Sequence, residues 1–586
     1  MKTNNMKIRY FFFVCLLVFA CKNNQKKLLP NIINVRLEGE LNQLNPILTT
    51  KAFCKQVEGQ LFMPLLGYDA ETLELYPVLA TSRPTIQVIT EGAFVGGRKY
   101  IFEIRPEAKW DDGQAVVADD FVFTLKAFLH PEIGHPGLRS FLSFIKSITI
   151  DPSNAKKFTV LTDVSINLAE EVIGTMAVYP KHIYDPTGIL ENYSIDIFTN
   201  RDIIRDKVES DSLLHQFAER FKQSGFSTTS GQVNGCGPYA IAEWIPGQRI
   251  ILKKKDHWWA ACLGESNPAF KYYPDELVYH FMEENITLAT LLKEQKIDVS
   301  AAIDPLIFDE LKKSEFIRES YNFFTPVSSA YYFISFNTKN PKLADKQTRK
   351  AISHLLNIEE TIRIAMNGYA TRTVGPILPV KPYYNKELKP IGFSIEKAKV
   401  LLKAAGWTDQ DQNGILEREI DGTLTDLSIK YKYTSNNTVA EKVGFLLKDN
   451  AAKAGIEVIL TPLANDKLIE DTRSRDFELY CSQWSQPPGL DDLSGIWHTE
   501  SDTPRGFNKA GFGNAKTDAL IEAINIVLDE EKRTEMYDEI QQIIYEEQPY
   551  VFLFVPTERI IIHKRFDAKT TNLRPGYFEN TFRMRE

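Results

Sequence analysis

The chain has 586 residues, of which 43% are hydrophobic and 25% are charged, and it carries a formal net charge of −8. Because a single hydrophobic core stops growing at about 250–300 residues, two or three domains are expected. Nucleic-acid binding is excluded, because Lys and Arg form runs of only two or three, such as residues 253–255, and no basic groove follows from them.

The first thirty residues predict export and membrane attachment. A positive segment precedes an apolar run over residues 10–20. This run is about half of the ~20 residues that a membrane-spanning helix needs, so residues 1–20 are predicted to be a signal peptide. Cys21 resembles the lipidated cysteine of a bacterial lipobox, with Phe19 as a departure from that pattern. Residues 21–30 would be a lipid-anchored tether; an ordinary secretory signal with an incidental cysteine is the alternative.

Further cysteines remain in the predicted mature chain. Their spacing fits no zinc or redox motif. In an oxidising compartment they allow three disulfide pairings, among which the sequence does not choose, and buried free thiols are the alternative. These cysteines are Cys54, Cys236, Cys262 and Cys481.

The first part of the mature chain is rich in predicted strands. Residues 85–105 predict a hairpin, because two segments of alternating polarity flank a pair of glycines. An amphipathic helix is expected to start at Asp119 and to stop before Pro131. A β-rich stretch follows over residues 148–161. The polar segment 189–233 is predicted to be an elaborated pair of surface helices.

From about residue 305 to residue 547 the pattern becomes α/β. Residues 395–405 predict a helix, because apolar side chains recur on one face. Ser394 is the expected N-cap of this helix, and Gly406 is expected just after its end. Neither an internal repeat nor a low-complexity linker marks a domain boundary.

A strand–helix–strand unit is predicted within this region. Strand candidates at residues 428–434 and 456–463 flank a helical pattern, and Thr438 with Glu441 predicts a capping box at its start. A connection of this kind joins parallel strands.

Several short blocks, taken in order, resemble the family 5 extracellular solute-binding proteins, which include oligopeptide-, dipeptide- and nickel-binding components. The blocks extend over nearly the whole mature chain, and this makes the resemblance specific. Asn45 and Cys236 depart from it, since the family usually has Asp and Thr there. The blocks are Leu44-Asn45-Pro46, residues 76–80, residues 100–121, Gly235-Cys236-Gly237-Pro238-Tyr239, residues 255–259, residues 295–298, residues 336–357 and residues 397–407.

The resemblance implies an α/β fold, namely a large two-lobed clamp of the type II periplasmic-binding-protein kind with an extra subdomain in its N-terminal half. In such proteins the ligand is expected between the lobes. The implied division is lobe I over residues 31–65, 230–305 and 548–586, the extra subdomain over residues 66–229, and lobe II over residues 306–547.

The same resemblance implies the extracytoplasmic substrate-binding lipoprotein of an ABC importer. Hinge closure would capture a peptide or peptide-like solute, and the closed form would deliver it to a permease of the cytoplasmic membrane. The implied protein is a monomer of the bacterial cell envelope, faces the periplasm or the exterior, and needs no cofactor beyond a structural calcium ion considered below. Within the family, the alternative is a binder of a nickel complex or an opine-like solute.

An enzyme is not expected. The sequence contains no Gly-x-Ser-x-Gly, no His-Glu-x-x-His and no Gly-Lys-Ser/Thr, and its nine histidines are scattered. A lipid-anchored hydrolase is therefore the weaker alternative from another class. A peptide-sensing lipoprotein without a permease is a further one.

Residues 476–487 resemble a ligand-proximal block of the family. In peptide-binding members an Asp three residues after the block's Trp pairs with the peptide α-amine, whereas this chain has Pro487 there. One of two aspartates just beyond could substitute. Alternatives are a core position for Trp484 and a solvated loop or N-cap for the aspartates. The predicted ligand-binding residues are Gln483, Trp484, Ser485, Asp491 and Asp492.

A second polar pattern resembles an EF-hand loop. Oxygen ligands occupy its positions one, three and five, and Gly414 occupies position six, but position twelve is Ile420 instead of the usual Glu. A structural calcium site is one interpretation, and a polar turn with Asx hydrogen bonds is the other. The predicted calcium ligands are Asp409, Asp411, Asn413 and Glu417.

Overall fold

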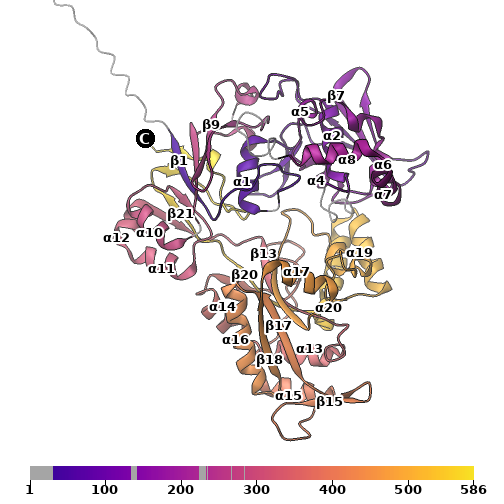
Figure 1. The fold of residues 1–586 in the computed structure, drawn as a ribbon, viewed down its shortest axis with the longest axis vertical. Coiled ribbons are helices and arrows are strands. Elements are labelled where there is room, and N and C mark those ends of the chain that lie inside the picture. The colour runs from indigo at the N-terminus through magenta and orange to yellow at the C-terminus, as the bar shows by residue number, and fades with distance from the viewer. Residues whose placement is uncertain are drawn as a thin grey trace, which may run out of the picture.

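The structure is a computed structural model that describes residues 31–585, except for residues 50, 134–141, 224–232, 234, 265–266 and 283. The predicted signal peptide, the lipidation site Cys21 and most of the tether therefore lie outside the described residues. Figure 1 shows an upper part that contains the N-terminal segments and a lower, mainly orange part.

A seven-stranded sheet lies in the upper part. In its middle, β1 (Ile32–Leu37) pairs in parallel with both β10 (Glu276–Phe281) and β11 (Val299–Ser300), and Ile33 and Val35 of β1 are fully buried. The sheet order is β12 (Tyr321–Phe324), β21 (Ile560–His563), β11, β1, β10, β9 (Arg249–Lys254) and β8 (Tyr239–Ile245). Its helices are α1 (Ala52–Leu61), α10 (Asn285–Lys293), α11 (Pro305–Lys313) and α12 (Glu315–Ser320).

The predicted hairpin and helix of the N-terminal half are present and form the extra subdomain. Phe121 of helix α2 (Ala118–Leu129) stacks on Phe158 of a four-stranded antiparallel sheet. That sheet has the order β4 (Thr85–Val88), β5 (Arg98–Glu103), β7 (Asn154–Thr162) and β6 (Ile145–Asp151). The buried side chains of this subdomain and of the seven-stranded sheet form one continuous hydrophobic cluster, so the subdomain shares its core with the larger sheet.

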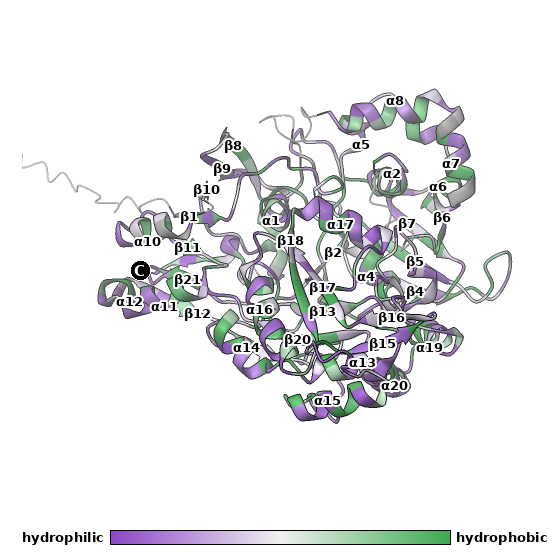
Figure 2. Ribbon diagram, turned by 60° about the horizontal axis from the view of Figure 1, so that its bottom comes forward, coloured by the Kyte–Doolittle hydropathy of each residue, from purple (hydrophilic) through white to green (hydrophobic). Residues whose placement is uncertain are grey.

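Smaller elements complete the subdomain. The predicted surface helices are α7 (Arg201–Ser210) and α8 (Ser212–Phe221), and Figure 2 shows both at the edge of the molecule with hydrophilic and hydrophobic residues alternating along them. Short strands β2 (Leu66–Tyr68) and β3 (Leu75–Pro77) form a two-stranded ribbon. The short helices are α4 (Ala169–Gly174), α5 (Lys181–Tyr184) and α6 (Ile195–Thr199).

The lower part is built on a six-stranded sheet with a separate hydrophobic cluster on each face. The sheet order is β14 (Ala370–Arg372), β20 (Tyr550–Pro556), β13 (Ala330–Phe336), β19 (Leu479–Ser485), β17 (Ser428–Thr434) and β18 (Glu457–Leu463). One cluster includes side chains of α13 (Lys346–Ser353), α14 (Ile358–Ala365), α15 (Ile395–Ala404) and α16 (Thr438–Ala452). The other includes side chains of α17 (Asn465–Ser474), α18 (Ser494–Trp497), α19 (Ala515–Ile526) and α20 (Glu530–Glu547).

The local predictions for this part are confirmed with one correction. Helix α15 has Ser394 as its N-cap, and the predicted crossover joins β17 to β18 through α16, with the two strands parallel. The predicted capping box is wrong. Asn437 caps α16 by accepting from the backbone N of Ala440 at 3.0 Å, because the helix begins one residue earlier than the Thr438 cap required.

The chain crosses between the two large sheets twice. We define lobe I by sheet membership as residues 31–324 and 560–585, and lobe II as residues 330–556. The crossing segments 325–329 and 557–559 pair with each other, since Ser328 N donates to Pro556 O at 2.9 Å and Glu558 N donates to Pro326 O at 2.8 Å.

Sheet membership differs from the predicted division at two places. The predicted boundary at residue 306 places β12 in lobe II. In the structure β12 pairs with β21 of the seven-stranded sheet, which is in lobe I. The predicted start of the last lobe I segment at residue 548 places β20 in lobe I. In the structure β20 pairs with β13 of the six-stranded sheet, which is in lobe II. Both strands are apolar, and the sequence pattern of an apolar strand does not identify the strand with which it pairs.

The four cysteines of the described chain are all free thiols. Cys54, Cys236 and Cys481 are buried and Cys262 is exposed, so buried free thiols, one of the two alternatives, describe three of them. Of the helices in the described ranges, none combines the length and apolar character that crossing a membrane requires.

Candidate ligand-binding cleft

The two large sheets meet the crossing segments at the carboxyl ends of their parallel strands. In lobe II, β17 and β19 are parallel and end at Thr434 and Ser485, and the second crossing leaves from Pro556 at the end of β20. In lobe I, β1 and β11 end at Leu37 and Ser300 beside the start of β21. Ligands of open α/β sheets bind outside the carboxyl ends of strands, so this junction is the expected site.

Two cavities lie at this junction. The larger has a volume of about 820 Å³ and is lined mainly by lobe I, with Ser329 of the first crossing and Pro488 of lobe II completing it. The smaller, of about 380 Å³, is lined by both lobes and by the crossing segments. Arg574 lines both cavities, so it is the residue that their walls share.

Charged side chains of both signs line the smaller cavity. Nε of Arg574 lies 3.7 Å from Oε1 of Glu558. The Arg559 guanidinium donates hydrogen bonds to backbone carbonyl oxygens. Burial lowers the pKa of Arg559, and the negative charges of Glu558 and Asp304 oppose that shift. With Lys442, the cations outnumber the anions on this wall.

The end of strand β19 has a free edge toward this region. β13 pairs with all of β19, from Ala330 opposite Ser485 to Phe336 opposite Leu479. On the other side β17 pairs only with Leu479 and Tyr480. Among the described strands, none is therefore paired with residues 481–485 on that side. An extended ligand backbone could add there as a further strand.

The three predicted ligand-binding residues of β19 alternate between the two faces of the strand, with Gln483 and Ser485 on one face and Trp484 on the other. Gln483 is exposed and lines the smaller cavity. Trp484 is half-buried; its ring stacks on Phe333 with 6.0 Å between centroids, and its Nε1 donates to Tyr550 OH at 3.4 Å. Ser485 is exposed at the end of the strand. The structure thus brings Gln483 to the cavity and packs one face of Trp484 against the lobe II core.

Asp491 and Asp492 have partners inside lobe II. Asp491 Oδ2 accepts from Tyr383 OH at 3.0 Å and lies 4.0 Å from Lys381 Nζ; burial raises the pKa of Asp491 to about 6, and these two neighbours oppose the rise. Asp492 Oδ1 accepts from Ser494 N at 2.8 Å, but Asp492 lies one residue before Leu493, which is the N-cap of α18. Neither is among the described residues that line the two cavities.

The extra subdomain contacts lobe II at another place. The backbone N of Asn167 donates to Asn525 O at 2.8 Å, and its Nδ2 donates to Ile524 O at 3.0 Å and Val527 O at 2.8 Å, at the end of α19. A Cβ atom at Gly489 would overlap a neighbouring carboxylate of the subdomain's helix α4. The two lobes are therefore in contact at a second place besides the crossing segments.

A family model for the bacterial extracellular solute-binding proteins, family 5 (middle), matches residues 74–506. The chain belongs to family 5 of the extracellular solute-binding proteins. The oligopeptide-binding protein AppA of Bacillus subtilis is 26% identical over 539 residues, which cover 90% of this chain and 87% of AppA. The family predicted from the sequence blocks is confirmed.

Solved structures of similar proteins show the same fold. AppA of Bacillus subtilis in complex with a nonapeptide superposes with a TM-score of 0.71 at 22% identity, over 95% of this chain and all of that chain. NikA of Brucella suis in complex with Fe(III)-EDTA gives a TM-score of 0.73 at 18% identity, over 94% of this chain and 100% of that chain. The predicted two-lobed α/β clamp of the type II periplasmic binding proteins is confirmed.

Blocks shared with family 5 that precede residue 300 contribute to the scaffold of lobe I. Trp110 Nε1 donates to Asp120 Oδ2 at 3.2 Å, which ties the turn to helix α2. Trp258 and Trp259 both donate to the carbonyl oxygen of Cys236, each at 2.8 Å. Burial raises the pKa of the Cys236 thiol to about 12, so the residue that departs from the family pattern stays protonated at neutral pH.

The charged residues of the smaller cavity were not predicted from the sequence. Glu558 and Arg559 come one residue after the apolar strand β20, and polar residues just after a buried strand are a usable signal in α/β proteins. Arg574 carries no such signal, because it lies in a loop that does not directly follow a long buried strand. The predicted calcium ligands lie elsewhere, between α15 and β15 (Glu417–Ile420), at the end of lobe II away from the cleft (Figure 1).

Proposed function

We propose that this family 5 protein is the substrate-binding component of an ABC importer, which captures peptides or peptide-like solutes between its lobes and delivers them to a permease. The observation that carries the proposal is the cleft: two cavities at the carboxyl edges of both sheets, beside the free edge of β19. A peptide backbone would hydrogen-bond to that edge, and its side chains would occupy the cavities. The role is binding, without catalysis.

Closure would follow from the two crossing segments. They form a narrow ribbon between the lobes, and rotation about such a ribbon needs changes in only a few backbone torsions. Because a ligand touches both lobes only in the closed form, its binding favours that form.

Arg574 and Glu558 are proposed to recognise the charged ends of the ligand. Peptide-binding relatives are expected to hold the α-amine with an Asp at the position of Pro487, and this chain offers no carboxylate there. The pair at the cavity wall supplies one group of each sign, suited to a carboxylate and an amine of the cargo.

The protein is proposed to act outside the cytoplasm, as the family name implies. We infer attachment to the membrane through lipidated Cys21, with the folded lobes in the periplasm or at the cell exterior, and action as a monomer.

The cationic wall of the smaller cavity favours a second candidate cargo, an anionic chelate or opine-like solute. NikA of Brucella suis, the similar structure named above, was solved with Fe(III)-EDTA.

Native mass spectrometry of the gently purified protein tests the proposal. A ladder of bound masses that resolves into short peptides on denaturation is expected. Arg574→Ala should lower the occupancy about tenfold, as expected for the loss of one charged hydrogen bond. Arg418→Ala is the matched control, because Arg418 stacks on Trp407 far from the cavities. One discrete non-peptide adduct would favour the second candidate, and a protein that neither carries nor binds any member of a peptide pool would contradict the first.

A further inference from the structure

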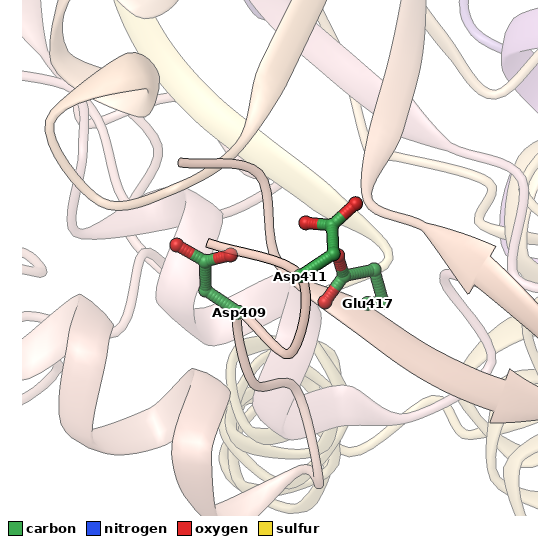
Figure 3. A group of neighbouring side chains, drawn as sticks. All are labelled: Asp409, Asp411 and Glu417. Carbon is green, nitrogen blue, oxygen red and sulfur yellow. The ribbon is translucent and has the colours of Figure 1, made fainter. Parts of the chain in front are cut away.

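Three carboxylates converge in the loop between α15 and β15. Ligand oxygens of Asp409, Asp411 and Glu417 all lie within 4.8 Å of one another (Figure 3). Among the described residues, no Lys, Arg or His forms an ion pair with any of the three. Like charges at this distance repel one another, so the arrangement lacks a positive partner.

Glu417 supplies an independent sign of a missing ligand. Its side chain is 1% exposed, yet Oε1 has no hydrogen-bond partner among the described residues. The other oxygen, Oε2, accepts from Gln410 N at 2.8 Å, which turns the carboxylate back into the loop. A buried carboxylate oxygen without a partner costs free energy unless a cation or a donor satisfies it.

The loop backbone fixes the remaining carboxylates. Gly414 N donates to Asp409 Oδ2 at 3.1 Å, and Asn413 N donates to Asp411 Oδ1 at 3.1 Å. Gly414 has a φ of +88°, a conformation that a side chain would strain, so glycine is needed for this turn. Asn413 Oδ1 accepts from Ile415 N at 2.7 Å and keeps a second lone pair available.

We propose that this loop binds one Ca²⁺ ion through Asp409, Asp411 and Glu417, with Asn413 and water completing the coordination. All donors are oxygens, which favours a hard cation over zinc, and the partly exposed loop suits the flexible six- to eight-fold coordination of Ca²⁺ better than the strict octahedron of Mg²⁺. The site differs from an EF-hand, because a strand follows the loop where an EF-hand has a helix, and Ile420 lies in that strand.

The ion would stabilise the distal part of lobe II. The loop follows α15, leads into β15, and touches the turn after α16, where Leu416 N donates to Gly455 O at 2.8 Å. One cation would therefore join three elements of this lobe, and it would leave the distant cleft unchanged. The site is independent of the proposed transport function.

Thermal unfolding of the EDTA-treated full chain, with and without Ca²⁺, tests the site. A concentration about 100 times the dissociation constant should raise Tm by roughly 2 °C. Glu417→Gln and Asp411→Asn should lose that shift and weaken Ca²⁺ binding at least tenfold in calorimetry. Asp421→Asn is the matched control, because Asp421 lies at the exposed tip of the next turn with a positive φ that Asn tolerates.

Three results would contradict the proposal. An unchanged Tm together with no heat of Ca²⁺ binding would overturn the proposal, as would an equal loss of the shift in Asp421→Asn. Mg²⁺ at the same concentration should give the smaller shift, and an equal one would refute the assignment to Ca²⁺. If Glu417→Gln fails to fold, the variant Asp411→Asn, at an exposed residue, still tests whether the loop binds Ca²⁺.

Discussion

Glu58 shows how burial sets the chemistry of a single side chain. It lies on α1 and is 3% exposed; one carboxylate oxygen accepts from the Thr49 hydroxyl, and the other has no partner among the described residues. Burial raises the pKa of Glu58 to about 7, and the Thr49 hydroxyl opposes the rise. The folded state therefore prefers the protonated acid.

This preference predicts a pH-dependent stability. Below pH 4.5 Glu58 is protonated in both the folded and unfolded states, and its contribution to stability is fully present. As the pH rises toward 7 the unfolded chain ionises first, so that contribution is lost. Relative to Glu58→Gln, the wild type should lose roughly 3 kcal/mol of unfolding free energy between pH 4 and pH 8. Urea unfolding at both pH values measures this, with the exposed Glu310→Gln as control; a pH-independent difference would refute it.

At the scale of elements, Arg349 explains one of the blocks that the chain shares with its family. Arg349 is 4% exposed on α13, whose N-cap is Asp345. Its guanidinium donates to carbonyl oxygens before α13 and at the end of α20. The acceptors are Leu343 O at 2.8 Å, Ala344 O at 2.7 Å, Glu547 O and Gln548 O at 3.1 Å. One side chain thus satisfies the carbonyl end of a helix distant in sequence.

Arg349→Met should destabilise the protein by about 3 kcal/mol or more. The methionine fills the space but leaves these buried carbonyls without donors, and each unsatisfied group is costly. Lys350→Met removes the neighbouring surface pair with Glu546 and should cost less than about 1 kcal/mol. Urea unfolding compares the two variants. Equal losses would show that the buried network contributes no more than the surface pair.

At the scale of the whole molecule, the two lobes are joined by the crossing ribbon and touch again at Asn167. This side chain donates to the carbonyl end of α19, far from the ribbon, so the contact stabilises the arrangement in which the lobes meet. Breaking it should favour a more open molecule, with lobe I and lobe II each left intact.

Asn167→Ala should therefore weaken cargo binding about tenfold, because two hydrogen bonds between the lobes are lost. Small-angle scattering of the cargo-free protein should show a larger radius of gyration, while the unfolding free energy changes little. Asn192→Ala is the matched control, because the described hydrogen bonds of the Asn192 side chain go to carbonyls of its own turn. An unchanged radius and affinity would show that this contact does not hold the lobes together.

Local sequence patterns were sufficient to predict many of the helices and strands. The cap at Ser394, the β17–α16–β18 unit and the α2 helix follow from residues close in sequence, whose propensities and periodicity act before any long-range contact forms. The family was predicted from the same kind of evidence. Of the cleft, only Gln483 was both predicted and found on a cavity wall.

The sequence by itself determined the element types, the family and the acidic loop at residues 409–417. Only the tertiary structure decided that β12 and β20 belong to opposite sheets from those predicted, that Arg574 stands beside Glu558, and that an oxygen of Glu417 is buried without a partner. The physical reason is that strand pairing, burial and charge proximity depend on residues far apart in the chain. No local pattern encodes which distant segment will supply the neighbour.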